Sequence, residues 1–153
     1  MLVTFFVPGV PGRKGRPRFS RRGPRVVAYT DDATHEFESR VALAGSWSFD
    51  TPFSGPIQLA VTAVYPRTSD LSRVLRSGPK HPVLRIDKTS SPDLDNVIKA
   101  VTDGLNGVAW LDDKQVSRYG ECRKCFACML MNGDGSWEQE PPGVEVVVTT
   151  LEL

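Results

Sequence analysis

The stretch from residue 93 to residue 116 constrains the fold of this chain more than any other. A helix is predicted over about residues 94–106, because Val97, Val101 and Leu105 recur at every fourth position and form one apolar stripe. Such a stripe has to pack against a core, so the opposite side of the helix is left to solvent.

The solvent side of this predicted helix carries regularly spaced charge. Asp95, Lys99 and Asp103 also recur at every fourth position, and they lie about 200° around the helix from the apolar stripe. Asp93 is a natural N-cap at the positive end of the helix dipole. Taken singly, these residues are typical of a cap and of a solvated face with i,i+4 pairing.

A second acidic element follows this helix. Gly104 and the pair Asn106-Gly107 are expected to end it, and Asp112-Asp113 then stands at a turn before a strand that starts near Gln115. That turn can fold back toward the first turn of the helix. Carboxylates gathered at one place resist ionising together, so such a site is usually stabilised by a hard cation such as Mg²⁺. The pattern favours metal-assisted phosphate chemistry.

Positive charge is segregated, although the net charge of the whole chain is only +1. Residues 13–25 include seven Lys or Arg and no acid, and a second basic stretch runs over residues 67–88. Such stretches release counterions when they meet a phosphate backbone, so we expect a polyanion partner; a merely solubilising arm is the alternative. Gly and Pro in the first stretch indicate a loop. The candidate nucleic-acid contacts are Arg13, Lys14, Arg16, Arg18 and Lys88.

The whole chain, residues 1–153, is expected to form one α+β domain, a small mixed β-sheet with helices packed on it. Strands are expected over residues 2–7, 57–65, 115–124 and 144–153. Further helices are expected over residues 32–47 and 71–75. Trp47 and Trp110 are interpreted as core aromatics, and Trp137 as a loop residue. The sequence contains no transmembrane or signal-peptide pattern, so a cytoplasmic location is expected.

Three ordered blocks resemble the signature of the RusA family of Holliday junction resolvases, short endonucleases often encoded by phages and prophages. The blocks are Pro-Asp-Leu-Asp-Asn-x-x-Lys from Pro92, Asp-Gly-Leu-Asn-Gly from Asp103 and Asp-Asp-x-Gln-Val from Asp112. Upstream, residues 12–19 and 29–38 resemble the basic segment and first helix of that family. Ordered blocks with compatible spacing seldom arise by chance.

The resemblance implies an Mg²⁺-dependent endodeoxyribonuclease, with Mn²⁺ as a substitute cation. Family members act as homodimers that resolve four-way DNA junctions by paired nicks in recombination and repair, and a two-fold enzyme suits a two-fold junction. Transferred to this sequence, the pattern gives metal ligands Asp93, Asp95 and Asp113, an essential Lys99, and supporting positions Asp103 and Asp112.

Two features depart from the family pattern. Ser91 stands where the family often has a basic residue, so Lys88 is the nearest cation. A CxxCxxC motif is formed by Cys122, Cys125 and Cys128, and a closed Zn²⁺ site there would need a fourth ligand from a histidine or a partner chain. Ordinary reduced thiols are favoured over zinc, and disulfides are not expected in the cytoplasm.

Two other classes of function stay open. A metal-dependent nuclease could prefer other branched DNA, such as flaps or forks, and comparing its cleavage of these with four-way junctions would separate that class. A non-catalytic DNA-binding module with a Cys-rich zinc element would bind DNA without Mg²⁺-dependent cleavage, and it would contain stoichiometric zinc.

Overall fold

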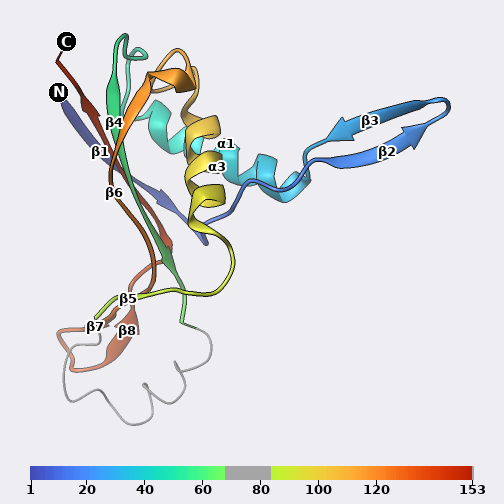
Figure 1. Ribbon diagram of the computed structural model, residues 1–153. Helices are drawn as coiled ribbons and strands as arrows, with labels where there is room; N and C mark the ends of the chain where they lie inside the picture. The colour runs from blue at the N-terminus through green and yellow to red at the C-terminus, as the bar shows by residue number, and fades with distance from the viewer. Residues whose placement is uncertain (68–83, 153) are drawn as a thin grey trace.

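The computed structural model describes residues 1–67 and 84–152. Its centre is a five-stranded sheet in the order β1-β9-β4-β6-β5, in which β4 and β6 run parallel and the other neighbours antiparallel. The strands are β1 (Leu2–Pro8), β4 (Ile57–Tyr65), β5 (Ile86–Asp87), β6 (Val116–Phe126) and β9 (Gly143–Thr150). Two helices, α1 (Asp32–Ser46) and α3 (Leu94–Leu105), lie together on one face of this sheet (Figure 1). The expected α+β class is confirmed.

The helix α3 packs as its periodicity predicted. Val97, Val101 and Leu105 are completely buried in the core between helix and sheet. Gly104, however, lies inside the helix, where an added Cβ would be only 2.8 Å from the backbone oxygen of Glu38 in α1. Its interpretation as a helix stop was wrong, because the close approach of α1 to α3 requires a residue without a side chain.

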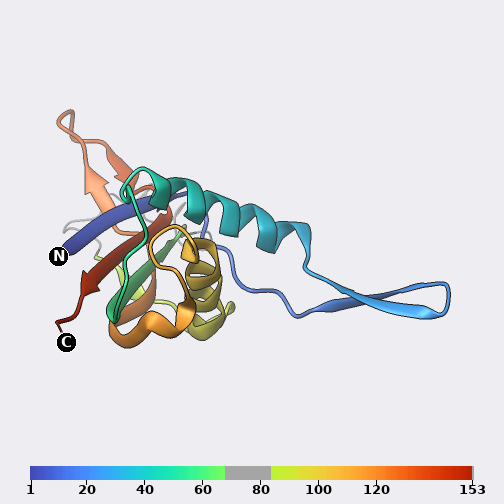
Figure 2. The same cartoon turned by 90° about the horizontal axis from the view of Figure 1, so that it is seen from above.

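Residues 18–29 form a hairpin where a loop was expected, and we call this hairpin the arm. Its strands β2 (Arg18–Arg22) and β3 (Arg25–Tyr29) pair antiparallel around Gly23, which has a φ of 63°. The arm projects from the body of the molecule beyond the start of α1 (Figures 1 and 2). The loop prediction was wrong because the Gly-Pro pair connects two strands, and β3 is rich in β-branched and aromatic residues.

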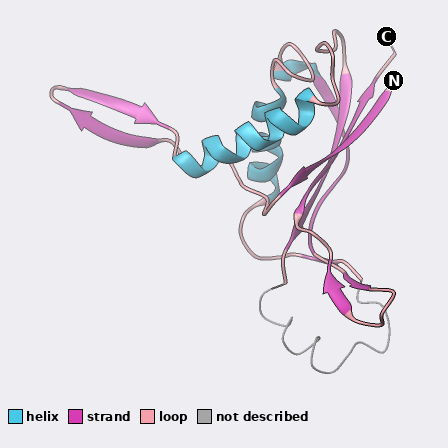
Figure 3. Cartoon of the chain, turned by 180° about the vertical axis from the view of Figure 1, so that it is seen from behind, coloured by secondary structure: helices cyan, strands magenta, loops and turns pink. Residues whose placement is uncertain are grey.

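The tryptophans follow the interpretation only in part. Trp110 is fully buried, as expected, but Trp47 is 84% exposed just after α1, so its core assignment was wrong. Trp137 belongs to a strand, not a loop, in the small hairpin of β7 (Met129–Met131) and β8 (Trp137–Gln139) at the far end of the sheet (Figure 3). The helix expected over residues 71–75 lies outside the described residues. No helix within the two described ranges is long and apolar enough to cross a membrane.

Candidate active site

The polar face of α3 and the turn before β6 line a cavity of about 330 Å³. Asp95, Lys99 and Asp103 contribute to it from α3, and Asp113 contributes from the turn. Two segments that are separate in the sequence therefore meet here, because the chain reverses after Gly107, whose φ is 78°. The prediction that the acidic turn folds back toward the start of α3 is confirmed for Asp95, and the predicted solvent-facing row is confirmed for Asp95 and Lys99, whereas Asp103 is only partly exposed. Tyr119, which sequence reasoning missed, also lines the cavity.

Asp113 is positioned from the core. It begins the 3₁₀ helix η1 (Asp113–Gln115), and its Oδ1 accepts a hydrogen bond of 3.0 Å from Nε1 of Trp110. A fully buried indole has its ring fixed by packing, so it orients the carboxylate that it contacts. Sequence reasoning did not assign this role to Trp110. The only sign of it in the sequence is a tryptophan three residues before an aspartate in a turn.

Asp112 supports the same turn. Its side chain accepts a hydrogen bond of 3.0 Å from the Lys114 backbone N–H, while Oε1 of Gln115 accepts one of 3.0 Å from the Asp112 backbone N–H. The Lys114 N–H and ammonium group together lower the pKa of Asp112. Gln115 also donates to the backbone oxygen of Phe53, which ties the turn to the loop before β4. These contacts give Asp112 the geometry of a cap.

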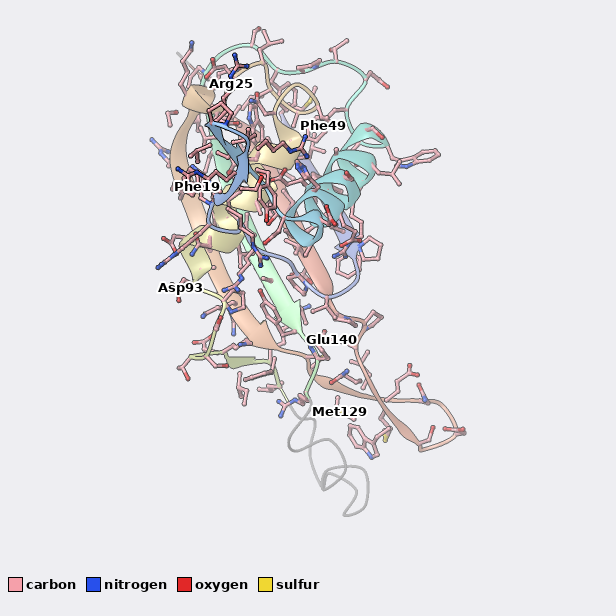
Figure 4. The ribbon with its side chains drawn as sticks, turned by 90° about the vertical axis from the view of Figure 1, so that its right-hand side faces the viewer. Phe19, Arg25, Phe49, Asp93, Met129 and Glu140 are labelled. Carbon is pink, nitrogen blue, oxygen red and sulfur yellow. The ribbon has the colours of Figure 1, made fainter. Side chains whose placement is uncertain are left out.

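Asp93 occupies the N-cap of α3, as expected, but in the described part of the chain its carboxylate makes no capping hydrogen bond. It lines a neighbouring cavity of about 380 Å³ together with Arg13, Arg16 and Arg18. Figure 4 marks Asp93 beside the start of α3. The three predicted ligands are thus divided between two adjacent cavities. Among residues 1–67 and 84–152, no three acidic, histidine or cysteine side chains lie close enough together to hold a metal.

Lys14 joins the basic segment to both helices. Its backbone N–H donates to the Asn96 oxygen at 2.9 Å, and its Nζ lies 2.7 Å from carboxylate oxygens of Glu38 in α1 and Asp103 in α3. Burial acts to lower the pKa of Lys14, but the hydrogen bonds to Asp103 and Glu38 outweigh burial and raise the pKa above its ordinary value. The ammonium that was predicted to contact nucleic acid is therefore already held by two carboxylates.

Lys88 and Lys124 hold the segment that leads into Asp93. Lys88 Nζ donates to the backbone oxygens of Ser90 and Ser91, and Lys124 Nζ donates to those of Ser90 at 2.8 Å and Pro92 at 2.5 Å. Burial, followed by repulsion from Lys124, lowers the pKa of Lys88. Both side chains thus help to fix the backbone immediately before the N-cap.

Residues 8–149 match the family described as Endodeoxyribonuclease RusA. The chain belongs to the RusA family. It is also 32% identical over 115 residues to the uncharacterized protein YqaN of Bacillus subtilis (strain 168), and this match covers 74% of the chain and 81% of YqaN. The RusA match spans the arm, both helices and the acidic turn, and it makes the chain an endodeoxyribonuclease.

The donor set of this RusA-family site fits a hard cation. Mg²⁺ prefers oxygen ligands, keeps several waters and is commonly held by one or two carboxylates together with substrate phosphate. Asp95 and Asp113 supply two carboxylates to one cavity that also has room for water and a phosphate group. Asp93 stands at the N-cap of α3. In the described part of the chain its carboxylate makes no capping hydrogen bond, so it is available to bind a cation.

The cysteines of the CxxCxxC motif have different surroundings. Cys122 packs against the main core, whereas Cys125 is buried in a separate cluster with Val64 and Ala127. The thiol of Cys128 lies 3.0 Å from Oε2 of Glu140. Burial and that carboxylate raise the pKa of Cys128 to about 11, so this thiol stays protonated at neutral pH.

The ion pairs of Lys14 predict a measurable effect on stability. Lys14→Met should lower the free energy of unfolding by about 1–2 kcal/mol, because it leaves two partly buried carboxylates without their shared cation. Lys114→Met is the matched control, since Lys114 is 81% exposed in its pair with Asp112. Urea titrations of both variants measure the difference. Equal losses would show that the Lys14 bridge adds no more than a surface pair.

Proposed function

We propose that this endonuclease resolves four-way DNA junctions by Mg²⁺-dependent paired nicking, with Mn²⁺ as a substitute. The observation that carries the proposal is the cavity in which Asp95, Lys99 and Asp113 meet beside a strongly basic segment. A hard cation held at this site would polarise the scissile phosphate and lower the pKa of a bound water. The setting that we propose is the cytoplasm, in recombination or repair of a phage or prophage genome.

Each residue of the site has a separate proposed role. Asp95 and Asp113 would hold the cation, with Asp93 proposed as the third ligand at the edge of the adjoining cavity. The exposed Lys99 would place positive charge beside the scissile phosphate, where negative charge grows in the transition state. Asp103 and Asp112 would support these groups through Lys14 and through the cap of η1.

The test is cleavage of a labelled mobile four-way junction, with and without Mg²⁺, compared with flaps, forks and linear duplex of the same sequence. Symmetrical nicks that need Mg²⁺ and appear mainly on the four-way junction would support the proposal. Faster cutting of flaps or forks would assign the same site to other branched DNA. Cutting that is undiminished in EDTA would refute the metal-dependent mechanism.

We propose that bound DNA lies across the cavity around Asp93 and extends into the cavity that contains Asp95 and Asp113. Arg13, Arg16 and Arg18 line that cavity around Asp93, so phosphates bound there would lie next to the acidic site. Lys88 is proposed as a further contact, although it already holds backbone oxygens before Asp93. This arrangement would bring the backbone of the cut strand along the N-terminal end of α3.

Replacing Arg16 and Arg18 together by alanine should weaken junction binding. The slope of log affinity against log salt concentration should fall by up to about two, because each lost phosphate contact releases roughly one fewer counterion. Arg123→Ala is the control, since Arg123 is already paired with Asp87 at 2.8 Å. Filter binding across a salt series measures the slope, and an unchanged slope in the double variant would mean that these side chains only solubilise the protein.

We propose a homodimer that forms through an apolar patch of Phe6, Leu43 and Trp47, which are 42%, 61% and 84% exposed. The patch borders a hollow of about 410 Å³ between β1 and α1. Arg40, at its edge, is engaged by Glu36 and by the backbone oxygen of Pro8, both at 2.7 Å. A patch with so little available charge suits an apolar self-contact and not DNA, and β1 is an edge strand of the sheet.

Trp47→Glu should therefore convert the protein to monomers at micromolar concentration and replace paired nicks by single nicks. Met131→Glu is the matched control, because Met131 is 65% exposed on β7, away from the patch. Sedimentation measures assembly, and a junction in a supercoiled plasmid distinguishes single from paired nicks. Excess Asp95→Asn protein mixed with wild type should likewise leave single nicks. A wild-type monomer with undiminished paired cutting in that mixture would contradict the dimer.

A further inference from the structure

The two faces of the arm differ in chemistry. Cross-strand partners in a hairpin share a face, so three of the four arginines, Arg18, Arg22 and Arg25, lie on one side together with Ser20, Val27 and Tyr29, and we call this side the arginine face. Phe19, Val26 and Ala28 lie on the other side together with one arginine, Arg21, which pairs with Val26, and we call this side the apolar face. Figure 4 shows Phe19 and Arg25 on the projecting hairpin.

The apolar face is open to solvent. Phe19 is 69% exposed and Val26 is 66% exposed, and every residue of the two arm strands except Ser20 is exposed. A two-stranded hairpin is marginally stable in water by itself, and it stabilises when a further surface covers one face. A protruding aromatic on such a hairpin therefore indicates a binding element.

The charge of the arm selects its partner. Residues 18–29 include four arginines and no acid, so the arm of a second copy would be repelled and a polyanion would be attracted. A linear duplex offers phosphates to the arginine face, but its stacked bases offer nothing to an aromatic ring. DNA in which base stacking is interrupted offers phosphates to the arginine face and an exposed base to the aromatic ring.

The root of the arm is fixed relative to the acidic site. Before the arm, the Gly15 N–H donates to Oγ1 of Thr34 in α1 at 3.0 Å, and Lys14 bridges the two helices. After the arm, Oδ1 of Asp31 caps α1 by accepting from the Thr34 N–H at 2.8 Å. Arg18, the first arm residue, lines the same cavity as Asp93. A molecule held by the arm is therefore placed next to the acidic site.

We propose that the arm enters the branch point of the DNA substrate, with Phe19 stacked on a base exposed there and Arg22 and Arg25 against the phosphates of the crossing strands. This inference rests on the proposed function and makes Phe19 a specificity-determining residue. Phosphate contacts bind any DNA, whereas stacking of an aromatic ring on a base left exposed where stacking is interrupted increases the affinity only for branched DNA. The preference for a junction over a duplex would thus arise outside the acidic cavity.

The test compares Kd values for a four-way junction and a matched duplex in EDTA, where no cleavage occurs. Phe19→Ala should weaken junction binding roughly 10-fold, the loss expected for one base–aromatic stack, and should leave duplex binding within about 2-fold. Phe19→Trp should restore the preference. Arg22→Ala combined with Arg25→Ala should weaken both substrates and lower the salt slope. Leu130→Ala, which removes a 44% exposed apolar side chain from β7, should change neither Kd.

An equal effect of Phe19→Ala on junction and duplex, or no effect, would overturn the role of the arm while wild-type cleavage of junctions still upheld the proposed function. Dissociation of the Phe19→Ala protein into monomers in sedimentation, with unchanged DNA binding per chain, would show that the arm binds a second copy. A wild-type protein without junction preference or junction cleavage would refute the proposed function and the arm's role together.

Discussion

Asp95→Asn and Asp113→Asn are each expected to abolish junction cleavage while junction binding stays intact or becomes tighter. Both carboxylates line the same cavity, and asparagine keeps their size but loses the charge that a hard cation requires. Loss of several kcal/mol of transition-state stabilisation corresponds to a rate decrease on the order of 10³ or more. Removing negative charge that faces phosphates accounts for binding that is no weaker.

Single-turnover cleavage with saturating protein measures this loss separately from binding. Asp112→Asn is the matched control, because Asp112 is the adjacent acid in sequence but caps η1 outside the cavity, so only a few-fold decrease is expected. Asp93→Asn tests the proposed third ligand and should resemble Asp95→Asn. Full activity in any two of the variants at Asp93, Asp95 and Asp113 would refute the assignment of the site.

The charged face of α3 was predictable because it depends only on helical spacing. The same reasoning applied to α1 predicts that Trp47 is exposed. Trp47 was instead assigned to the core because aromatic residues are usually buried. Phe37, Val41 and Gly45 form the buried row of α1, and Trp47 stands two residues beyond that row. A shift of two residues is about 200° around the helix, so Trp47 faces away from the core.

Other parts of the site depend on tertiary contacts that spacing does not encode. The orientation of Asp113 requires the burial of Trp110, and the pairing of Lys14 requires α1 and α3 to cross at Gly104. The separation of Asp93 from Asp95 also arises from the surroundings, since the basic segment lies against the N-cap of α3. The family signature places these aspartates close in sequence, but only the structure assigns each one its cavity.

Lys99→Ala should lower the cleavage rate by a factor on the order of 10² or more, with the fold and junction binding almost unchanged. Lys99 is exposed on the polar face of α3 and lines the cavity with Asp95 and Asp113, so its removal is expected to disturb the packing of the helix little. Its loss removes a preorganised positive charge from the place where the scissile phosphate gains negative charge. Lys99→Arg keeps the charge but alters its position, so it should recover only part of the rate.

Lys114→Ala separates this effect from a general loss of positive charge near the site. Lys114 lies in the adjoining turn, 3.1 Å from Asp112 and 81% exposed, and its variant should cleave within about 3-fold of wild type because an exposed pair contributes little. Single-turnover rates at saturating protein, with thermal unfolding as a check of the fold, compare the three lysine variants. If Lys99→Ala and Lys114→Ala lost rate equally, the lysine would act only through long-range attraction of DNA, and the transition-state role of Lys99 would be wrong.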